Sequence, residues 1–516
     1  MSKPRVSTSA LVASAVAIAV AAVLAACGGG ARTHSSPATA RTPTHTSAAT
    51  AGARTHTRPA TASRRTQSPP RVVVAISSRR SGHSLPAAFV GLAMEDWTLT
   101  KHQFAHTNLR RYLLRLGPRG LLRIGGNSQD RSFWTSRHEH PPRWAQGTAT
   151  PASLRELAGV LHGTGWRVIL GVNLLHFDPA RAVDEARSAA RILGTKLAAI
   201  GIDNEPDRYG ISEQRYLHEF QRYARALRAA VPGVGIAGPD TSSSGRRWLT
   251  TFARQQTRAR EITLLTAHNY PATACDGHRP TIAQLLSFPA ERSERAAADT
   301  AVAAGRLDRV PATIDETNSA VCWGAPGTSD VFASALWSLD YTLLLAHAGL
   351  ASVEFQGRIA GCAPYSPLCT GRHGAALFAR PDFYGLLTVQ QLLPGAFLRL
   401  TDRDAGKLRA YALIAPSGAL SVVLDNLGGP LVVALRLPGR GYRSAAETVL
   451  RTSSSRGLAA TGGITLGGRQ IGPGAAMAAP AYRPLGLREG SVAVTVAAHS
   501  AVILRIPRAD GLLQTR

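Results

Sequence analysis

The chain has 516 residues, of which 44% are hydrophobic, and its formal net charge is +27. This composition is that of a folded globular protein and not of a disordered or fibrous one. Arginine supplies nearly all of the positive charge, because the only lysines are Lys3, Lys101, Lys196 and Lys407. No basic module with interleaved aromatic residues, typical of nucleic-acid-binding proteins, accompanies the charge, so we expect no nucleic-acid partner.

The N-terminus carries a predicted export signal. Lys3 and Arg5 precede an apolar run from Leu11 to Ala26, and the run ends in Leu24-Ala25-Ala26-Cys27 before three glycines. This order is typical of a secretory signal, and the tetrapeptide resembles the bacterial lipobox. We therefore expect residues 1–27 to be a lipoprotein signal, with Cys27 as the lipid attachment site and the protein on the outer face of the bacterial cell membrane. An ordinary signal peptide with an unmodified cysteine is the alternative.

A linker is predicted from residue 28 to residue 70. It consists mainly of Ala, Thr, Ser, Pro, Gly, His and Arg, and no acidic residue occurs in the chain before Glu95. A segment with so few large apolar side chains cannot offset its ordering entropy, which predicts disorder. Its uniform positive charge suggests an anionic partner in the cell envelope, such as anionic lipid or cell-wall polymer.

A (β/α)8 TIM barrel is predicted for residues 85–394. Short apolar runs alternate with helical stretches such as Pro151–Leu161, Pro179–Leu193, Ser212–Ala230 and Ser329–His347, which favours parallel strands covered by helices. No Gly-x-Gly-x-x-Gly fingerprint follows the first strand, so a dinucleotide is not expected. The predicted strands are Phe89–Met94, Leu121–Gly125, Val168–Asn173, Ala198–Asp203, Gly235–Gly238, Leu264–His268, Ala312–Asp315 and Ser352–Phe355.

A second, all-β domain is predicted for residues 395–516. Its strand-like runs are separated by Gly, Pro, Ser and Asn, a pattern typical of a compact sandwich-like domain. A strand at Val72–Ile76, followed by a turn at Ser81–His83, lies before the barrel, and we expect residues 71–84 to join this domain. The predicted strands of the domain are Leu408–Ile414, Leu420–Leu424, Leu431–Leu437, Ser491–Val496 and Ala501–Ile506.

Four cysteines follow Cys27, and an even number in an exported protein suggests two disulfides. Four cysteines allow three pairings. We expect Cys362–Cys369, which closes a short loop, and Cys275–Cys322, which then ties two loops of one barrel face. A metal site is not expected, because no Cys-x-x-Cys motif or histidine cluster accompanies these cysteines.

Two glutamates follow predicted barrel strands 4 and 7. Glu205 lies in Asp203-Asn204-Glu205-Pro206 and Glu316 in Asp315-Glu316-Thr317-Asn318. Functional side chains of such barrels gather where strands end, and retaining glycosidases need two carboxyl groups about 5–5.5 Å apart. A single carboxylate at a strand end is more often a helix cap or a surface ion pair. The presence of two such glutamates, after strands 4 and 7 of a predicted eight-stranded barrel, favours a glycosidase.

These motifs resemble those of clan A retaining glycosidases, and more narrowly glycoside hydrolase family 79, which includes β-glucuronidases and heparanase-like enzymes. The resemblance covers about residues 71–400, and a small β-domain follows in the family as well. The runs that carry it are Phe89–Glu95, Leu122–Asp130, Asn204–Asp207, Glu316–Ser319, Ser329–Trp337 and Ala379–Leu387.

The resemblance implies a role for individual residues. Glu205 corresponds to the acid/base and Glu316 to the nucleophile, and Asn204 to the residue that binds the sugar 2-hydroxyl. Tyr270 corresponds to the tyrosine that steadies the nucleophile. Glu95 and Asp130 are expected to bind distal hydroxyls, and Gln356 and Gly357 to line the pocket. Packing before Pro271, or a buried polar network without substrate contact, are the alternatives for these supporting residues.

The resemblance implies a retaining exo-β-glycosidase, with β-glucuronidase as the first choice, a carbohydrate substrate and no cofactor. Strand 8 departs from the family pattern at Gln356-Gly357-Arg358, where many relatives carry a histidine and a second glycine. Arg358 could bind a uronate carboxylate or be one more surface arginine. A β-glycosidase for a non-uronate sugar or a disaccharide unit, and a non-catalytic carbohydrate-binding lipoprotein, are the alternatives.

Overall fold

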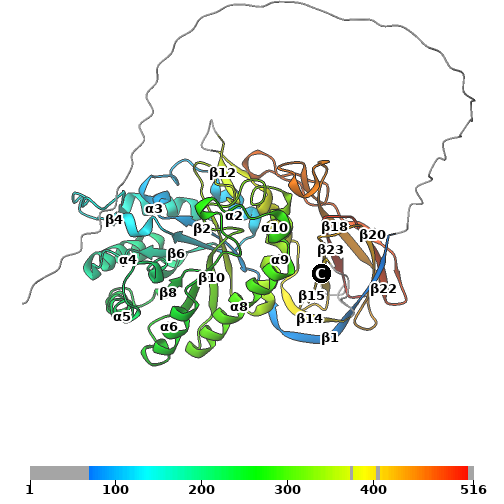
Figure 1. Ribbon diagram of the computed structural model, residues 1–516, viewed down its shortest axis with the longest axis horizontal. Coiled ribbons are helices and arrows are strands. Elements are labelled where there is room, and N and C mark those ends of the chain that lie inside the picture. Colours follow the sequence, from blue (N-terminus) through cyan, green and yellow to red (C-terminus); the bar gives the residue numbers. More distant parts are fainter. Residues whose placement is uncertain (1–68, 372–375, 402–406, 510–516) are drawn as a thin grey trace, which may run out of the picture. The chain divides into compact units, whose positions relative to one another are not determined.

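The computed structural model describes residues 69–371, 376–401 and 407–509. Cys27, the predicted signal at 1–27 and nearly all of the predicted linker lie outside the described residues. Within them the chain forms a barrel and a large, mostly antiparallel sheet (Figure 1).

The predicted barrel is confirmed. Eight parallel strands close in the order β10-β11-β2-β3-β6-β7-β8-β9. Strands β2, β10 and β11 are buried throughout, and the other five along all but one of their first two residues, as expected for strands covered by helices outside and by side chains inside. The strands are β2 (Val90–Glu95), β3 (Leu121–Gly125), β6 (Arg167–Val172), β7 (Leu197–Ile202), β8 (Gly235–Thr241), β9 (Leu264–Asn269), β10 (Ala312–Thr317) and β11 (Val353–Gly357).

Helices surround the barrel (Figure 1). Their starts follow local chemistry: Pro179 opens α4, and the side chain of Asp178 accepts a hydrogen bond from the Arg181 backbone N–H at its N-cap. None of the described helices is both long enough and apolar enough to cross a bilayer. The helices of eight or more residues are α2 (Leu109–Leu116), α3 (Pro151–Leu161), α4 (Pro179–Leu193), α5 (Glu213–Ala230), α6 (Arg246–Ala259), α8 (Phe288–Asp308), α9 (Phe332–Ala348) and α10 (Pro381–Val389).

Helix α9 is buried on nearly all sides, because it contacts α8, α10, the barrel strand β11 and the sheet domain. Helix α10 approaches it closely at Gly385, where an added Cβ would overlap Ser338 Oγ and the carbonyl oxygen of Ala335. A glycine is therefore required at this crossing.

The C-terminal domain is an eleven-stranded sheet in the order β19-β18-β23-β16-β15-β14-β1-β17-β22-β21, with β20 paired to β18. Side chains of β16 and β23 share one core with those of β17 and β22, so the sheet curls over itself. Its strands are β1 (Arg71–Leu85), β14 (Gly395–Thr401), β15 (Leu408–Ile414), β16 (Leu420–Asn426), β17 (Leu431–Arg436), β18 (Ala445–Thr452), β19 (Ile464–Leu466), β20 (Arg483–Leu485), β21 (Leu487–Arg488), β22 (Ser491–Val496) and β23 (Ser500–Ile506).

The expected turn at Ser81–His83 is wrong. Strand β1 continues through it to Leu85, pairing in parallel with β17 and antiparallel with β14. The pairing with β14 shifts register between Ile76 and Arg80 and again between Arg80 and Ser84. Gly82, with a φ of 103°, lies in this irregular part. The glycine therefore accommodates a bulged strand instead of ending it.

The sheet domain is packed on both faces where it meets the barrel. On β16, Val422 and Leu424 face the core of the sheet domain, whereas Val423 belongs to the core shared with the barrel. Strand β23 alternates in the same way, with Leu504 and Ile503 on opposite sides. Tyr411 of β15 also donates a hydrogen bond to Asp340 Oδ1 of α9 at 2.7 Å. The sheet domain thus supports the helix layer behind the barrel.

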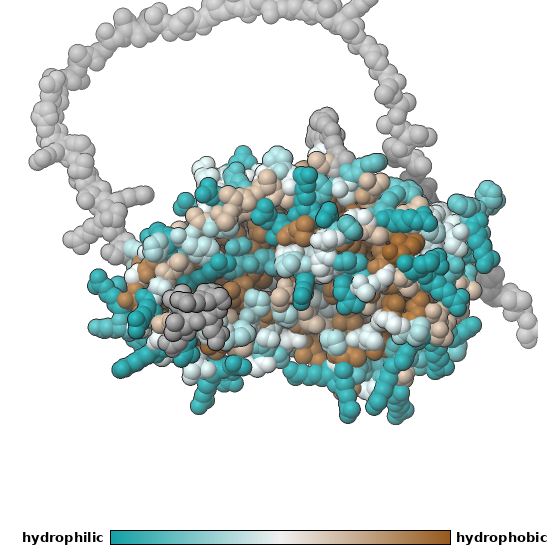
Figure 2. Space-filling model, turned by 180° about the vertical axis from the view of Figure 1, so that it is seen from behind, coloured by the Kyte–Doolittle hydropathy of each residue, from teal (hydrophilic) through white to brown (hydrophobic). Residues whose placement is uncertain are grey.

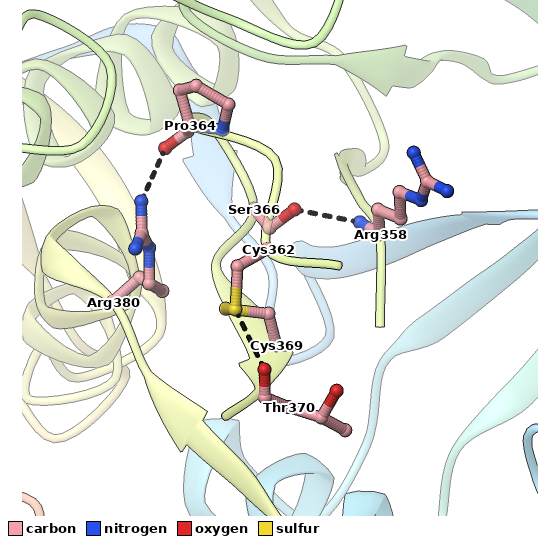
Figure 3. The surroundings of a disulfide bond; sticks show 7 residues. All are labelled: Arg358, Cys362, Pro364, Ser366, Cys369, Thr370 and Arg380. Carbon is pink, nitrogen blue, oxygen red and sulfur yellow. Dashed lines mark hydrogen bonds between the residues drawn. A yellow bond between two sulfur atoms is a disulfide. The ribbon is translucent and has the colours of Figure 1, made fainter. Parts of the chain in front are cut away.

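Both expected disulfides are present, Cys275–Cys322 and Cys362–Cys369. The second closes the loop after β11, in which the backbone N–H of Arg358 donates to Ser366 Oγ and Arg380 donates to the Pro364 carbonyl (Figure 3). The loop is thereby held against β11 at the carboxyl end of the barrel. On the outer surface, hydrophilic side chains stand between smaller apolar patches (Figure 2).

Candidate active site

A cavity of about 390 Å³ opens at the carboxyl ends of the barrel strands. Four of the predicted site residues line it: Glu95 at the end of β2, Asp130 after β3, and Asn204 and Glu205 after β7. Trp97 and Trp323 line it as well. The strand ends therefore bring residues together that are far apart in the sequence, as the barrel fold requires.

Arg123 of β3 lies beneath this cavity and is only 1% exposed. Its guanidinium donates to Glu316 Oε2 at 2.7 Å, to Asp240 Oδ2 at 2.9 Å and to Asn204 Oδ1 at 3.0 Å. Its Nε lies 3.1 Å from Asp315 Oδ2. A buried guanidinium is stable only when carboxylates and hydrogen bonds compensate it. Arg123 therefore fixes the ends of β7, β8 and β10 relative to one another.

Glu316 of β10 is held as a carboxylate. Burial by itself would raise its pKa, but the positive charges of His268 and Arg123, and hydrogen bonds from Tyr270 and Arg123, lower the pKa below its usual range. Tyr270 Oη donates to Glu316 Oε1 at 2.9 Å while Arg123 donates to Oε2. Both oxygens are thus oriented, and the group is an ionised, immobilised nucleophile candidate.

Glu205 lies three residues after the end of β7. Its backbone is left-handed, with φ 48°, and its N–H donates to the Asp240 carbonyl at 2.9 Å. Asp203, two residues earlier, has a φ of 95°. Such strained positions persist where the surrounding structure determines them, often at functional sites. The turn directs the Glu205 side chain into the cavity, beside His268 Nδ1 at 3.2 Å and Arg208 Nε at 3.6 Å.

His268 of β9 links the two glutamates. Burial lowers its pKa, but the charge of Glu316, the hydrogen bond to Glu205 and the charge of Asp315 raise it to about 9. The ring is therefore cationic at neutral pH, with Nδ1 toward Glu205 and Nε2 3.8 Å from Asp315 Oδ1. Both glutamates therefore raise the pKa of one buried ring, Glu316 through its charge and Glu205 through a hydrogen bond.

Two further carboxyl groups of the cavity, Glu95 and Asp130, are held by neighbouring residues of its wall. Glu95 Oε2 accepts hydrogen bonds from the Ser128 backbone N–H at 2.8 Å and its hydroxyl at 2.5 Å. Burial, followed by the charge of Glu316, raises the pKa of Glu95 to about 7. Asp130 accepts from Tyr209 Oη at 2.6 Å, and burial raises its pKa to about 7. These carboxyl groups can present hydroxyl-binding atoms in a fixed direction.

Gln356 and Gly357 of β11, which were predicted to line the pocket, are not among the residues that line this cavity. Gln356 Nε2 donates to Glu95 Oε1 at 3.3 Å, so it orients a cavity residue without itself lining the cavity. An added Cβ on Gly357 would lie 2.9 Å from Pro367 Cδ, so this glycine allows the disulfide loop to approach β11. Tyr270 and Glu316 contact each other just behind the cavity wall.

Two indole rings form the rim. Trp97 and Trp323 stack with centroids 5.9 Å apart, and the Arg358 guanidinium lies 5.0 Å from the Trp97 ring and 5.5 Å from the Trp323 ring. Trp323 follows Cys322, and both have left-handed backbones, so the Cys275–Cys322 disulfide holds the turn that presents this ring. Tyr365, inside the loop closed by Cys362–Cys369, packs against Trp323 and Tyr270.

Sequence reasoning missed several residues of this arrangement. A signal existed for Arg123, since a single arginine inside an apolar parallel strand must be buried with partners. The parts played by His268, Asp240 and Asp315 depend on side-chain geometry that no spacing reveals. Trp97 and Trp323 meet only because two separate loops converge at the rim.

Asp240, His268 and Asp315 are close enough together to ligate a cation. Arg123 already ion-pairs with both aspartates, and its guanidinium, together with the protonated His268, supplies the positive charge that these carboxylates need. The residues therefore form a charge network and do not fit a metal centre.

No protein-family model matches the chain. A β-glucuronidase of Neurospora crassa is 23% identical over 374 residues, which cover 60% of this chain and 65% of that protein. A β-glucuronidase of Aspergillus niger is 26% identical over 266 residues, which cover 45% of this chain and 48% of that protein. The chain thus spans about two thirds and about half of these relatives.

Solved structures resemble the chain over 84% of its length. A 4-O-α-L-rhamnosyl-β-D-glucuronidase of Fusarium oxysporum superposes with a TM-score of 0.69 at 18% identity and is covered to 99%. A family 51 arabinofuranosidase of Xanthomonas axonopodis, covered to 100%, has a TM-score of 0.60 at 13% identity. An α-L-arabinofuranosidase of Thermotoga maritima, also covered to 100%, has a TM-score of 0.60 at 11% identity. The fold is therefore the barrel with an appended β-domain found in these structures.

The charge network makes a prediction about His268. Its ring should titrate near pH 9 in a histidine NMR titration, and Glu316→Gln should lower this midpoint, since Glu316 is the largest influence that raises the pKa. Because the folded pKa is raised, the stabilisation from this charge is present below the usual pKa of 6.5 and is lost as the pH rises through about 9. His176, whose pKa burial lowers, serves as the internal control. A His268 midpoint below 6.5 would contradict the network.

Proposed function

We propose that the chain is a retaining exo-β-glycosidase that hydrolyses β-glucuronides, with Glu316 as nucleophile and Glu205 as acid/base. The sequence relatives named β-glucuronidase support the activity, as does the structural similarity to a glucuronidase of Fusarium oxysporum. The motif resemblance to glycoside hydrolase family 79 supports the same activity.

One observation carries the proposal. Glu316 is kept ionised by Arg123, Tyr270 and His268, while Glu205 projects into the adjoining cavity and contacts the same histidine. Double displacement needs two carboxyl groups at one sugar, one to attack the anomeric carbon and one to transfer a proton. An isolated helix cap or surface ion pair would have no reason to be built into a buried network.

The reaction follows from these positions. Glu316 attacks the anomeric carbon as Glu205 protonates the departing glycosidic oxygen, which forms a covalent glycosyl-enzyme. Glu205, now a carboxylate, removes a proton from water, and the water oxygen displaces Glu316 from the anomeric carbon. Asn204 binds the 2-hydroxyl with an amide held by Arg123 and Asn127. Glu95 and Asp130 bind hydroxyls farther from the cleaved bond.

The position of Arg358 favours a substrate with an anionic sugar. Its guanidinium lies against the two rim indoles, and it has no carboxylate partner among the residues that the structure describes. Arg131 and Arg208 line the cavity nearby. A uronate carboxylate entering beside Trp97 and Trp323 would give Arg358 the charge-assisted partner that it lacks.

Replacing the two glutamates tests the mechanism. Glu316→Ala should reduce hydrolysis of 4-nitrophenyl β-D-glucuronide to background. Glu205→Ala should slow cleavage of glucuronides with poor leaving groups by about 10²–10⁴-fold, but should impair glycosylation by the 4-nitrophenyl substrate far less, because 4-nitrophenolate departs without a proton. NMR of the first-formed product should show the β-anomer. The matched control is Glu219→Ala, on α5; parent-like activity in both site variants would refute the assignment.

Replacing Arg358 tests the sugar. Arg358→Gln should lower kcat/KM for the 4-nitrophenyl glucuronide by about 10–100-fold, the loss expected when one charged contact to the substrate is removed. Activity on the matching glucoside should change little. Arg254→Gln, on the outer helix α6, is the control. An equal loss on both substrates would assign Arg358 a purely structural part.

We further propose that the protein is exported and carries lipid on Cys27, with residues 28–70 lying against anionic polymers or lipids of the envelope. The lipobox-like Leu24–Cys27 and the acid-free, arginine-containing segment support this location. Cys27→Ser should move the protein from the membrane fraction to the soluble fraction in high salt, while some stays bound in low salt through the linker. Unchanged membrane association in high salt would oppose lipidation.

A further inference from the structure

The turn that carries Glu205 has an unusual backbone and ends at Tyr209. After β7 the chain passes through Asp203, with φ 95°, and Glu205, with φ 48°, and then through the short 3₁₀ helix η3 (Pro206–Arg208). Positive φ values are strained in residues other than glycine, so they persist only where the surrounding structure fixes them. The position of the Glu205 side chain therefore depends on what holds this turn.

Tyr209 Oη lies between two aspartates. It hydrogen-bonds to Asp203 Oδ1 inside the turn and, at 2.6 Å, to Asp130 Oδ1 in the segment after β3. Asp203 Oδ1 also accepts a hydrogen bond from the Asn204 backbone N–H at 2.6 Å. Tyr209 thereby joins the end of β7 to the end of β3 through one oxygen atom.

These two hydrogen bonds of Tyr209 require a proton on an aspartate. A phenol hydroxyl carries one hydrogen, so it can donate to only one of the two carboxyl oxygens at a time. The other bond forms when the second carboxyl group is protonated and donates to Oη. Burial raises the pKa of Asp203 well above its usual range and the pKa of Asp130 to about 7, so such a proton is present at neutral pH. Both hydrogen bonds can therefore exist together.

The other contacts of the turn do not replace this one. The Asp207 carboxylate accepts from the Ser242 backbone N–H at 2.9 Å, which ties the turn to the segment after β8 and not to the segment after β3. The side chain of Asn204 is held separately, because its Oδ1 accepts from the buried Arg123 at 3.0 Å. Loss of the Tyr209 hydroxyl should thus affect the acid/base more than the residue that binds the 2-hydroxyl.

We propose that Tyr209 is a positioning residue for the acid/base. Its hydroxyl fixes the turn that carries Glu205 against the segment after β3, and it orients the Asp130 carboxyl group toward the cavity that both residues line. This inference rests on the proposed function, in which Glu205 transfers a proton to the leaving oxygen.

Tyr209→Phe tests the inference by removing one oxygen atom. A displaced Glu205 protonates the leaving oxygen less well, so kcat/KM for methyl β-D-glucuronide should fall by about 10–100-fold, the effect of a small misplacement of a catalytic group. For 4-nitrophenyl β-D-glucuronide, whose leaving group departs without a proton, kcat/KM should fall by less than about threefold. Asp130 binds the sugar and not the leaving group, so any change in its contact affects both substrates equally. The ratio of the two kcat/KM values therefore reports on Glu205 alone.

Tyr223→Phe is the matched control. Tyr223 is a buried tyrosine of α5 whose hydroxyl donates to the Asn173 carbonyl at 2.9 Å and accepts from the Asp178 N–H, away from the turn. This variant should keep the parent ratio of the two kcat/KM values. If Tyr209→Phe does not fold, Asp203→Gly takes its place under the same criteria, because glycine suits the φ of 95° and the change removes one of the same two hydrogen bonds.

The outcomes separate this inference from the proposed function. A lowered ratio in Tyr209→Phe together with the parent ratio in Tyr223→Phe supports the positioning role. A parent ratio in Tyr209→Phe, or equal losses on both substrates, overturns it and leaves the proposed function standing. A parent protein that cleaves neither substrate refutes the proposed function, and the positioning role with it.

Discussion

The guanidinium of Arg123 inside the barrel holds three carboxylates that would otherwise repel one another. Asp240, Asp315 and Glu316 come from two strands, and each lies within about 3 Å of a nitrogen of this one group. Removing one partner of a buried ion pair typically costs about 3–5 kcal/mol, because an uncompensated charge remains. The end of the barrel can therefore concentrate acidic residues only while this arginine is in place.

The same charge also makes the two glutamates unequal. Arg123 donates hydrogen bonds to the Glu316 carboxylate and to the side-chain amide oxygen of Asn204. Glu205 is instead contacted by His268 and Arg208. Acids farther from the guanidinium, such as Glu95 and Asp130, have pKa values raised to about 7 by burial. Distance from Arg123 is not the sole factor, because burial also raises the pKa of Asp315, which lies 3.1 Å from the guanidinium. Acid/base chemistry at neutral pH needs neighbouring carboxyl groups whose pKa values differ.

The barrel could be predicted because its strands are short apolar runs, and all eight were recognised to within a few residues. Helices α2, α6, α8 and α10 were not named, although α6 does carry an apolar face with Leu249, Phe252 and Ala253; α8 is alanine-rich, so its buried face stands out less. Strand β1 is longer than Val72–Ile76 because its polar second half pairs with β14 through bulges. Periodicity cannot reveal a pairing made with residues some 300 positions away.

The candidate site was predictable only at its strand ends. Glu205 and Glu316 stand out because each comes at the end of an apolar strand, whereas Trp323 depends on a turn held by a disulfide. In this fold the strand ends carry the catalytic residues and the loops shape the substrate site. The sequence can therefore indicate the reaction without indicating the shape of the substrate.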